Sequence, residues 1–273
     1  MKAISDNLIH FLGRQLKDSP GKQFEIFKLI VTQGLRCGKT PIKFGESAVV
    51  YGQTVCFTDL PLTYCDEHTA IYGKFGIGFK KSFIKNNGGN PARYFVDSYP
   101  METRDTAKVE NRGLLYANLC NHLKIVKGLK DLMSADDKLS IHDEKGNLLL
   151  NNDDLVNWVN QQIAVLSFEK EMGDLGSARD DTKEIDLYYK EREWRLVPFL
   201  ANIISGSVQY GNEGLMFYKF RREDVNMVVV PNEEMRKIVL EYFEGLISSQ
   251  DARERTFGEN PPPIISYDDL LKW

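Results

Sequence analysis

The stretch NMVVVPNEEMRKIVLEYFEGLI, residues 226–247, says most about the fold. Its first part is a short valine-rich run that is typical of a buried strand, and Pro231 ends that run. Its second part places apolar residues at helical spacing, with Glu233 and Glu234 where the first helical turn would begin. A strand followed directly by an amphipathic helix predicts a protein of mixed α and β structure.

Similar patterns occur outward along the chain. Strands are expected at residues 7–13, 54–62, 75–84 and 92–96, and helical patterns at 24–35, 111–132 and 155–170. The GGNP turn at 88–91 predicts that the strand at 92–96 pairs with the strand at 75–84. Helices gather in the middle and strands at both ends, without regular βαβ alternation. We therefore predict a single α+β domain over residues 1–273, with a mixed or antiparallel sheet and a helical insert at 111–170.

Composition limits the classes of protein that the chain can represent. Apolar residues make up 42% and charged residues 27% of the 273, which is ordinary globular usage. The net charge of −4 gives no overall attraction to nucleic acid or to anionic lipid. No apolar run approaches the roughly 20 residues of a membrane span, and the first residues lack the apolar core of a signal peptide. The four cysteines show no CxxC spacing, so we expect reduced thiols, a cytoplasmic location and no membrane contact.

The densest run of charges is EREWR, residues 191–195. Alternate side chains of a strand share a face, so Glu191, Glu193 and Arg195 are expected on one side. Trp194 would then turn to the core. Two carboxylates beside a guanidinium are costly to bury and useful in a cleft, because repulsion raises one carboxylate pKa while the arginine lowers the other. The alternative is a solvated strand face with a cross-strand salt bridge.

Several polar residues elsewhere are candidates for a binding site. His10 stands in an apolar strand, LIHFL, as either a core residue or a neutral imidazole that donates to a ribose hydroxyl. Thr58 ends a strand in CFTDLPL, where a polar group either caps a turn or faces a pocket. Arg14 is either an anion contact or a surface charge. Tyr72 follows His68 by four residues, and the two either contact each other or form part of a pocket wall.

Several motifs with a known mechanism are absent from the sequence. The chain has no GxGxxG, GxxxxGK[ST], HExxH or GxSxG motif, and its histidines and cysteines are too scattered for a zinc site. A hydrolytic effector that uses a divalent ion would need a third acid beside Glu191 and Glu193. Asp59 is the candidate for that third ligand.

Five groups of motifs occur in a fixed order: IHFLGR…FKLIVTQGL, VCFTDLPL…YGKFGIGFKK, GGNPARYF, KEREWRLVP and VNMVVVPNEE. Together they resemble the AbiGi family of bacterial abortive-infection, or phage-resistance, proteins over roughly residues 7–245. More loosely, they resemble a wider group of uncharacterised proteins that share the EWR motif. The resemblance implies one half of a two-gene toxin–antitoxin pair, in which AbiGi is usually called the antitoxin and has a cognate partner protein.

The order of the motifs also resembles that of ADP-ribosyltransferases, particularly the toxins that modify nucleic acids. That resemblance implies their α+β fold and NAD as a substrate. By it, His10 would contact the nicotinamide ribose and Thr58 would line the NAD pocket. Glu191 would orient the acceptor, a nucleic acid or a protein, and Glu193 would stabilise the oxocarbenium-like transition state.

The transferase hypothesis therefore names two sets of residues. The predicted catalytic residues are Glu193 and Glu191, and the predicted NAD-binding residues are His10, Arg14, Thr58, Tyr72 and Arg195. The sequence departs from the transferases in lacking a clear Ser-Thr-Ser triplet and an aromatic stacking tyrosine. The alternative is a non-enzymatic antitoxin or sensor that binds a partner toxin or its own promoter DNA. The acidic composition and the lack of a helix-turn-helix pattern argue against DNA.

Overall fold

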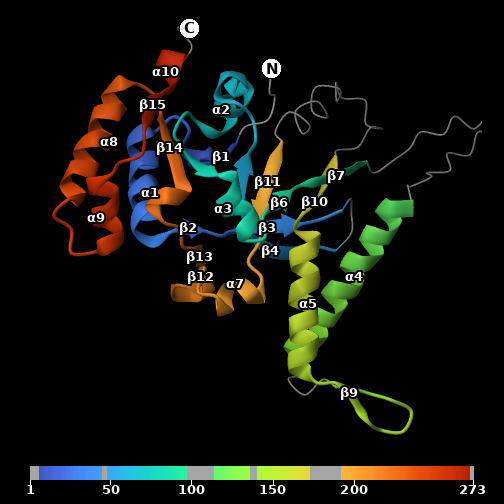
Figure 1. Ribbon diagram of the computed structural model, residues 1–273. Helices are drawn as coiled ribbons and strands as arrows, with labels where there is room; N and C mark the ends of the chain where they lie inside the picture. The colour runs from blue at the N-terminus through green and yellow to red at the C-terminus, as the bar shows by residue number, and fades with distance from the viewer. Residues whose placement is uncertain (1–5, 45–47, 97–113, 136–139, 173–191, 271–273) are drawn as a thin grey trace, which may run out of the picture. The chain divides into compact units, whose positions relative to one another are not determined.

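The computed structural model of the chain describes residues 6–44, 48–96, 114–135, 140–172 and 192–270 (Figure 1). The chain divides into two compact units, each built from separate segments of sequence. The first unit comprises Met1–Cys37, Val55–Pro91 and Lys190–Trp273, and the second comprises Gly38–Thr54 and Ala92–Tyr189. The predicted α+β class with a mixed sheet is confirmed. A single domain with an insert at 111–170 stays a prediction.

The first unit is a mixed sheet with helices packed against it. The sheet strands are β1 (Asn7–Phe11), β4 (Val50–Thr58, which belongs to this unit from Val55 on), β5 (Gly76–Lys80), β6 (Asn90–Pro91), β11 (Glu193–Leu196), β14 (Val225–Val230) and β15 (Ile264–Ser266). Their spatial order is β15-β14-β5-β1-β4-β11-β6, with β14 and β15 parallel and the other pairs antiparallel. A smaller antiparallel sheet contains β2 (Leu35–Arg36), β12 (Val208–Tyr210) and β13 (Met216–Tyr218). The helices are α1 (Pro20–Gln33), α2 (Asp66–Tyr72), α3 (Lys81–Asn86), α7 (Leu200–Ile204), α8 (Glu233–Leu246), α9 (Ala252–Glu259) and α10 (Tyr267–Leu270).

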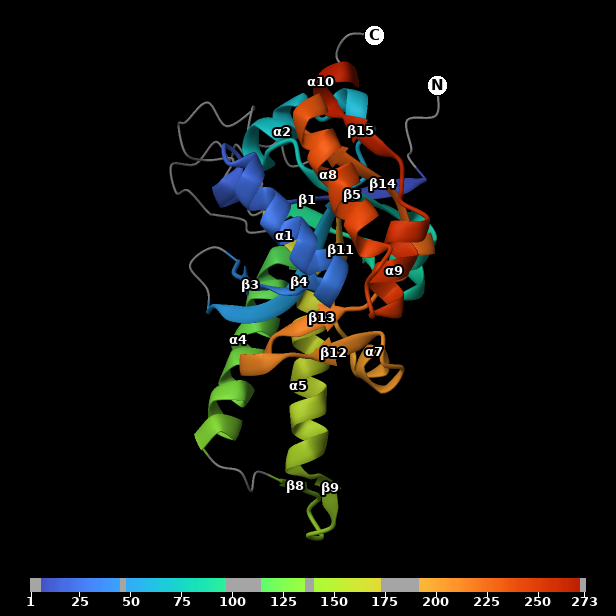
Figure 2. The same cartoon turned by 90° about the vertical axis from the view of Figure 1, so that its left-hand side faces the viewer.

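One face of the sheet carries the main hydrophobic core, which α1, α8 and α9 share with the strands (Figures 1 and 2). Phe27 of α1 and Phe243 of α8 are both 1% exposed, and their ring centroids lie 5.8 Å apart. The predicted strand, proline break and helix at 226–247 are confirmed as β14 and α8. Asn232 caps α8, because its side-chain oxygen accepts from the Met235 amide at 3.0 Å.

The opposite face of the sheet carries a smaller core. Ile9 and Phe11 of β1 pack there with Cys65, beside the start of α2, and with Tyr267 of α10. Leu8, the neighbour of Ile9 in sequence, belongs to the main core instead. The strand predicted at residues 7–13 is thus buried on both faces, which accounts for its nearly continuous apolar sequence.

Two expectations about strands are wrong. The run predicted as one strand at 75–84 is β5 only as far as Lys80, and α3 follows it. The segment at 92–96 forms β7 (Arg93–Val96), which pairs in parallel with β10 (Glu169–Met172) and not with β5. The physical reason lies in the GGNP turn. Its Asn90 and Pro91 form β6, which pairs with β11 at the edge of the sheet. The turn therefore leads the chain to β11 and not back to β5.

The second unit contains a pair of long helices, α4 (Leu114–Ala135) and α5 (Asn152–Leu166), which lie side by side in both views (Figures 1 and 2). Buried residues such as Leu123 and Val159 pack between them. A hairpin of β8 (Ile141–His142) and β9 (Leu148–Leu150) lies between the helices in sequence, and β3 (Gly38–Ile42) pairs with the first part of β4. The two predicted helices at 111–132 and 155–170 are confirmed, although β10 takes the last residues of the second. Among the described residues, no helix combines the length and the apolar character that crossing a membrane requires.

Candidate functional site

The EWR motif forms β11, which pairs antiparallel with β4. Glu193 lies opposite Thr58, and Arg195 lies opposite Cys56. Directly paired residues share a face of a sheet, so Glu193, Arg195 and Thr58 point to the same side. Trp194 alternates with them and packs against the main core on the other side. The predicted alternation is therefore confirmed for the part of β11 that the structure describes.

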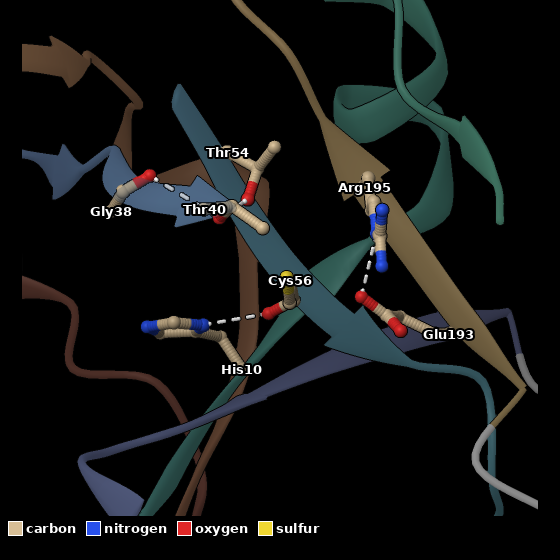
Figure 3. A network of polar contacts seen from close by, with 7 residues as sticks. All are labelled: His10, Gly38, Thr40, Thr54, Cys56, Glu193 and Arg195. Carbon is tan, nitrogen blue, oxygen red and sulfur yellow. Dashed lines mark hydrogen bonds and ion pairs between the residues drawn. The ribbon is translucent and has the colours of Figure 1, made fainter. Parts of the chain in front are cut away.

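Glu193 and Arg195 form a buried ion pair. The Arg195 Nε donates to the Glu193 Oε1 at 2.7 Å (Figure 3). Arg195 is 6% exposed and Glu193 is 9% exposed. Residues two apart on a strand project from the same face, so this pair forms within one strand. The salt bridge that the sequence suggested is present, but it is buried within β11 and does not cross strands on a solvated face.

A second charged group lies where β4 ends. Asp59, which is 5% exposed, accepts a hydrogen bond at its Oδ2 from the Lys81 Nζ at 2.9 Å. The same oxygen lies 3.7 Å from a guanidinium nitrogen of Arg192, and the Asp59 amide donates to the Arg192 carbonyl at 3.1 Å. Lys81 Nζ also lies 5.2 Å from the centroid of the Trp194 ring. Asp59 therefore ties the end of β4 to α3 and to the residue before β11.

The backbone of Arg192 is unusual. Its φ of 43° lies in the left-handed region, which costs a residue other than glycine about 1 kcal/mol or more. The side-chain and main-chain contacts with Asp59 hold this conformation in place. Residues held in sparsely populated backbone conformations cluster at functional sites, and Arg192 lies directly before β11.

The charges of this cluster nearly cancel. Its members are two acids and three bases: Asp59, Glu193, Lys81, Arg192 and Arg195. The buried Asp59 Oδ1 has no hydrogen-bond donor among the described residues, so it can accept one from a water or a ligand. In the described ranges, no group of three histidine, cysteine or acidic side chains is placed to hold a metal ion.

His10 lies on the neighbouring strand but faces the other layer. Ile9 pairs with Thr58 and so shares the face of Glu193. His10 is the next residue of β1 and turns to the opposite face, where its ring centroid lies 5.7 Å from that of Phe57. The register thus separates the imidazole from the carboxylate by the thickness of the sheet.

The hydrogen bond of His10 gives it a structural role. The His10 Nδ1 lies 2.8 Å from the Cys56 carbonyl oxygen (Figure 3), which can only accept, so Nδ1 carries the proton. In the described chain, β1 and β4 pair only through Ile9 and Thr58. The imidazole adds a hydrogen bond to the carbonyl of Cys56, which lies two residues before Thr58 in β4. Burial lowers the pKa of His10, while the bond to the carbonyl opposes that shift. The imidazole is therefore neutral at pH 7.

The other predicted site residues lie elsewhere. Tyr72 stacks on His68 in α2 with ring centroids 4.4 Å apart, as their spacing suggested, and it packs against the smaller core. Arg14 begins a short 3₁₀ turn, Arg14–Leu16, but its side chain lies outside the described part of the structure, as does Glu191. The structure brings together three predicted site residues, Thr58, Glu193 and Arg195, and does not bring His10 to them.

Sequence reasoning missed Lys81 and Arg192. A usable signal existed for Lys81, because it directly follows a buried strand, just as Asp59 follows β4. The expectation of a strand continuing to residue 84 concealed that position. The left-handed conformation of Arg192 has no signal in the sequence, since arginine shows no preference for it.

The fold and the site define an α+β protein with a buried charge cluster between β4, α3 and β11. Residues 48–231 match the family described as "Putative abortive phage resistance protein AbiGi, antitoxin". That range contains the Asp59 cluster and most of the second unit, and the chain belongs to the AbiGi family. No curated protein and no solved structure matches the chain, so the predicted likeness to the ADP-ribosyltransferase fold has no structural neighbour behind it.

Proposed function

We propose that this protein is the antitoxin of an abortive-infection pair and that it acts by binding a partner toxin. The family match over residues 48–231 carries the proposal, because the family is described as an abortive phage resistance protein and as an antitoxin. We expect a dissociation constant near the nanomolar range, which corresponds to about −12 kcal/mol.

The charge cluster supports a binding protein better than a catalyst. A carboxylate that takes a proton or attacks a substrate needs an oxygen that the substrate can reach. Here Glu193 is held by Arg195 and Asp59 by Lys81, and the two acids are 9% and 5% exposed. Ion pairs of this kind, made within one compact unit, fix the ends of β4 and β11 and give a stiff scaffold.

The test is co-expression with the protein encoded by the adjacent gene. We expect that protein alone to arrest growth, the chain to relieve the arrest, and the purified pair to bind with a nanomolar dissociation constant. The proposal fails if the chain alone is toxic, or if the two purified proteins do not bind each other in isothermal titration calorimetry.

NAD-dependent ADP-ribosyl transfer to a nucleic acid or a protein is the second candidate. The placement of Thr58, Glu193 and Arg195 on one face supports it, whereas the register that turns His10 away does not. Incubation with labelled NAD and cell extract tests it directly. Label that moves to a macromolecule, and that Glu193→Gln abolishes, would establish the transferase. Unchanged NAD would refute it.

A further inference from the structure

The hairpin of β8 and β9 exposes a group of large apolar side chains. Ile141, Leu148, Leu149 and Leu150 are 42%, 55%, 57% and 38% exposed, respectively. Figure 2 shows the hairpin at one end of the pair formed by α4 and α5. Ile141 pairs with Leu150 and His142 with Leu148, with a register shift between them, so apolar side chains project from both faces of the hairpin. A two-stranded hairpin of this kind is marginally stable in water and gains stability when a partner covers it.

The same hairpin region is acidic. Residues 140–154 contain four acids and one lysine, a local net charge of −3. The four acids are Asp143, Glu144, Asp153 and Asp154. The exposed leucines therefore lie beside a local excess of negative charge.

The local structure holds these acids in fixed positions. Asp143 Oδ1 accepts from the Lys145 and Asn147 amides at 2.8 and 2.7 Å, which closes the turn of the hairpin. Asp154 and Asn151 form a reciprocal cap at the start of α5, with bonds of 2.9 and 3.1 Å. Both carboxylates face the solvent at either end of β9, so the apolar side chains have an acidic border built by the fold.

The combination selects the chemistry of the partner. An acidic border repels DNA, RNA and anionic lipid, and a second copy of the chain would bring like charge against like charge. A protein with an apolar groove bordered by lysine or arginine complements both features. We infer that the hairpin at residues 141–150 is the surface that binds the toxin, and that the toxin presents such a groove. This inference rests on the proposed antitoxin function.

The experiment measures binding of the full chain to the purified product of the adjacent gene by biolayer interferometry. Leu148→Ser with Leu149→Ser removes the apolar contact, and Glu144→Lys reverses one border charge. We expect the double variant to raise the dissociation constant at least about tenfold. We expect Glu144→Lys to slow association several-fold at low salt and to lose that effect at high salt.

Matched controls lie in the first unit. Ile204→Ser changes an apolar residue of α7 that is 78% exposed, and Glu241→Lys reverses an exposed charge on α8. Both controls should bind as the unchanged chain does. Circular dichroism confirms folding of every variant, which we expect because the replaced side chains are exposed.

Each outcome bears on one of the two claims. If the unchanged chain binds and the hairpin variants bind equally well, the hairpin inference is overturned while the antitoxin proposal stands. If the unchanged chain does not bind, the antitoxin proposal fails and the inference fails with it. Self-association in analytical ultracentrifugation that the double variant abolishes would assign the hairpin to a second copy and would also overturn the inference.

Discussion

Replacing Glu193 by glutamine tests whether the buried ion pair of β11 is part of the scaffold. Glutamine has the same shape and can still accept the Arg195 Nε hydrogen bond, so the change removes charge and little else. Arg195 would then be a buried cation, 6% exposed, with its nearest carboxylate gone. Breaking a buried pair by removing one partner costs about 3–5 kcal/mol. Because the hydrogen bond survives, we expect a smaller loss, about 2–3 kcal/mol of unfolding free energy.

Urea denaturation followed by tryptophan fluorescence measures this free energy. Trp194 packs against the main core, and replacing Trp158 and Trp273 by phenylalanine in every protein makes it the single reporter for the first unit. Arg195→Met and the double variant complete a double-mutant cycle. The double variant should lose less stability than the two single losses added together, because neither charge is left alone, and the coupling should be about 1–3 kcal/mol.

Two results would refute this account of Glu193. A loss of stability below about 0.5 kcal/mol would show that the pair does not stabilise the fold, since that is the range of ordinary surface changes. A coupling of zero would show that Glu193 and Arg195 act independently. If either result came with loss of NAD-dependent labelling, Glu193 would be a catalytic residue of the second candidate function.

Two further predictions concern backbone and protonation. Folding lowers the pKa of His10. The unfolding free energy should therefore be at its full value above about pH 6.5 and should fall as the pH drops below that value. The reason is that the unfolded chain binds a proton at a pH where the folded chain does not. His10→Gln, which can still donate to the Cys56 carbonyl, should flatten that pH profile, and an unchanged profile would show that another group causes it. Gly34→Ala should cost at least about 2 kcal/mol, because φ is 107° and the new Cβ would lie 2.5 Å from the Tyr218 carbonyl oxygen. In Gly245→Ala, the new Cβ in α8 meets nothing within 4 Å, so this variant should instead be more stable by about 0.5–1 kcal/mol. Thermal unfolding measures both variants, and equal effects at the two sites would contradict the steric argument.

Local patterns in the sequence predicted local structure well. The strand, proline break and helix at 226–247 are present, and Gly34 ends α1 with its positive φ. The two-residue alternation placed Glu193 and Arg195 on one face. These features depend on neighbours in sequence, which the pattern of side chains reports directly.

Pairing between distant segments could not be predicted. β7 and β10 pair across more than 70 residues of sequence. The placement of His10 relative to Glu193 depends on the register of β1 against β4, in which Ile9 pairs with Thr58. A shift of that register by one residue would move His10 to the face of Glu193, and the nearly continuous apolar sequence of β1 does not show from sequence which of its faces takes which core. The shared pocket of the transferase hypothesis depended on this choice.

The family match gives a further reason to separate scaffold from binding surface. Its range, 48–231, includes the Asp59 cluster and the hairpin at 141–150 but leaves out His10. We therefore expect the function common to the family to be carried by residues inside that range. Within it, Asp59 pairs with Lys81 and Glu193 with Arg195, whereas the leucines of the hairpin are exposed in the described structure. Exposed apolar side chains beside acidic ones are what a partner protein can use, so we propose the binding role for the hairpin and the stabilising role for the ion pairs.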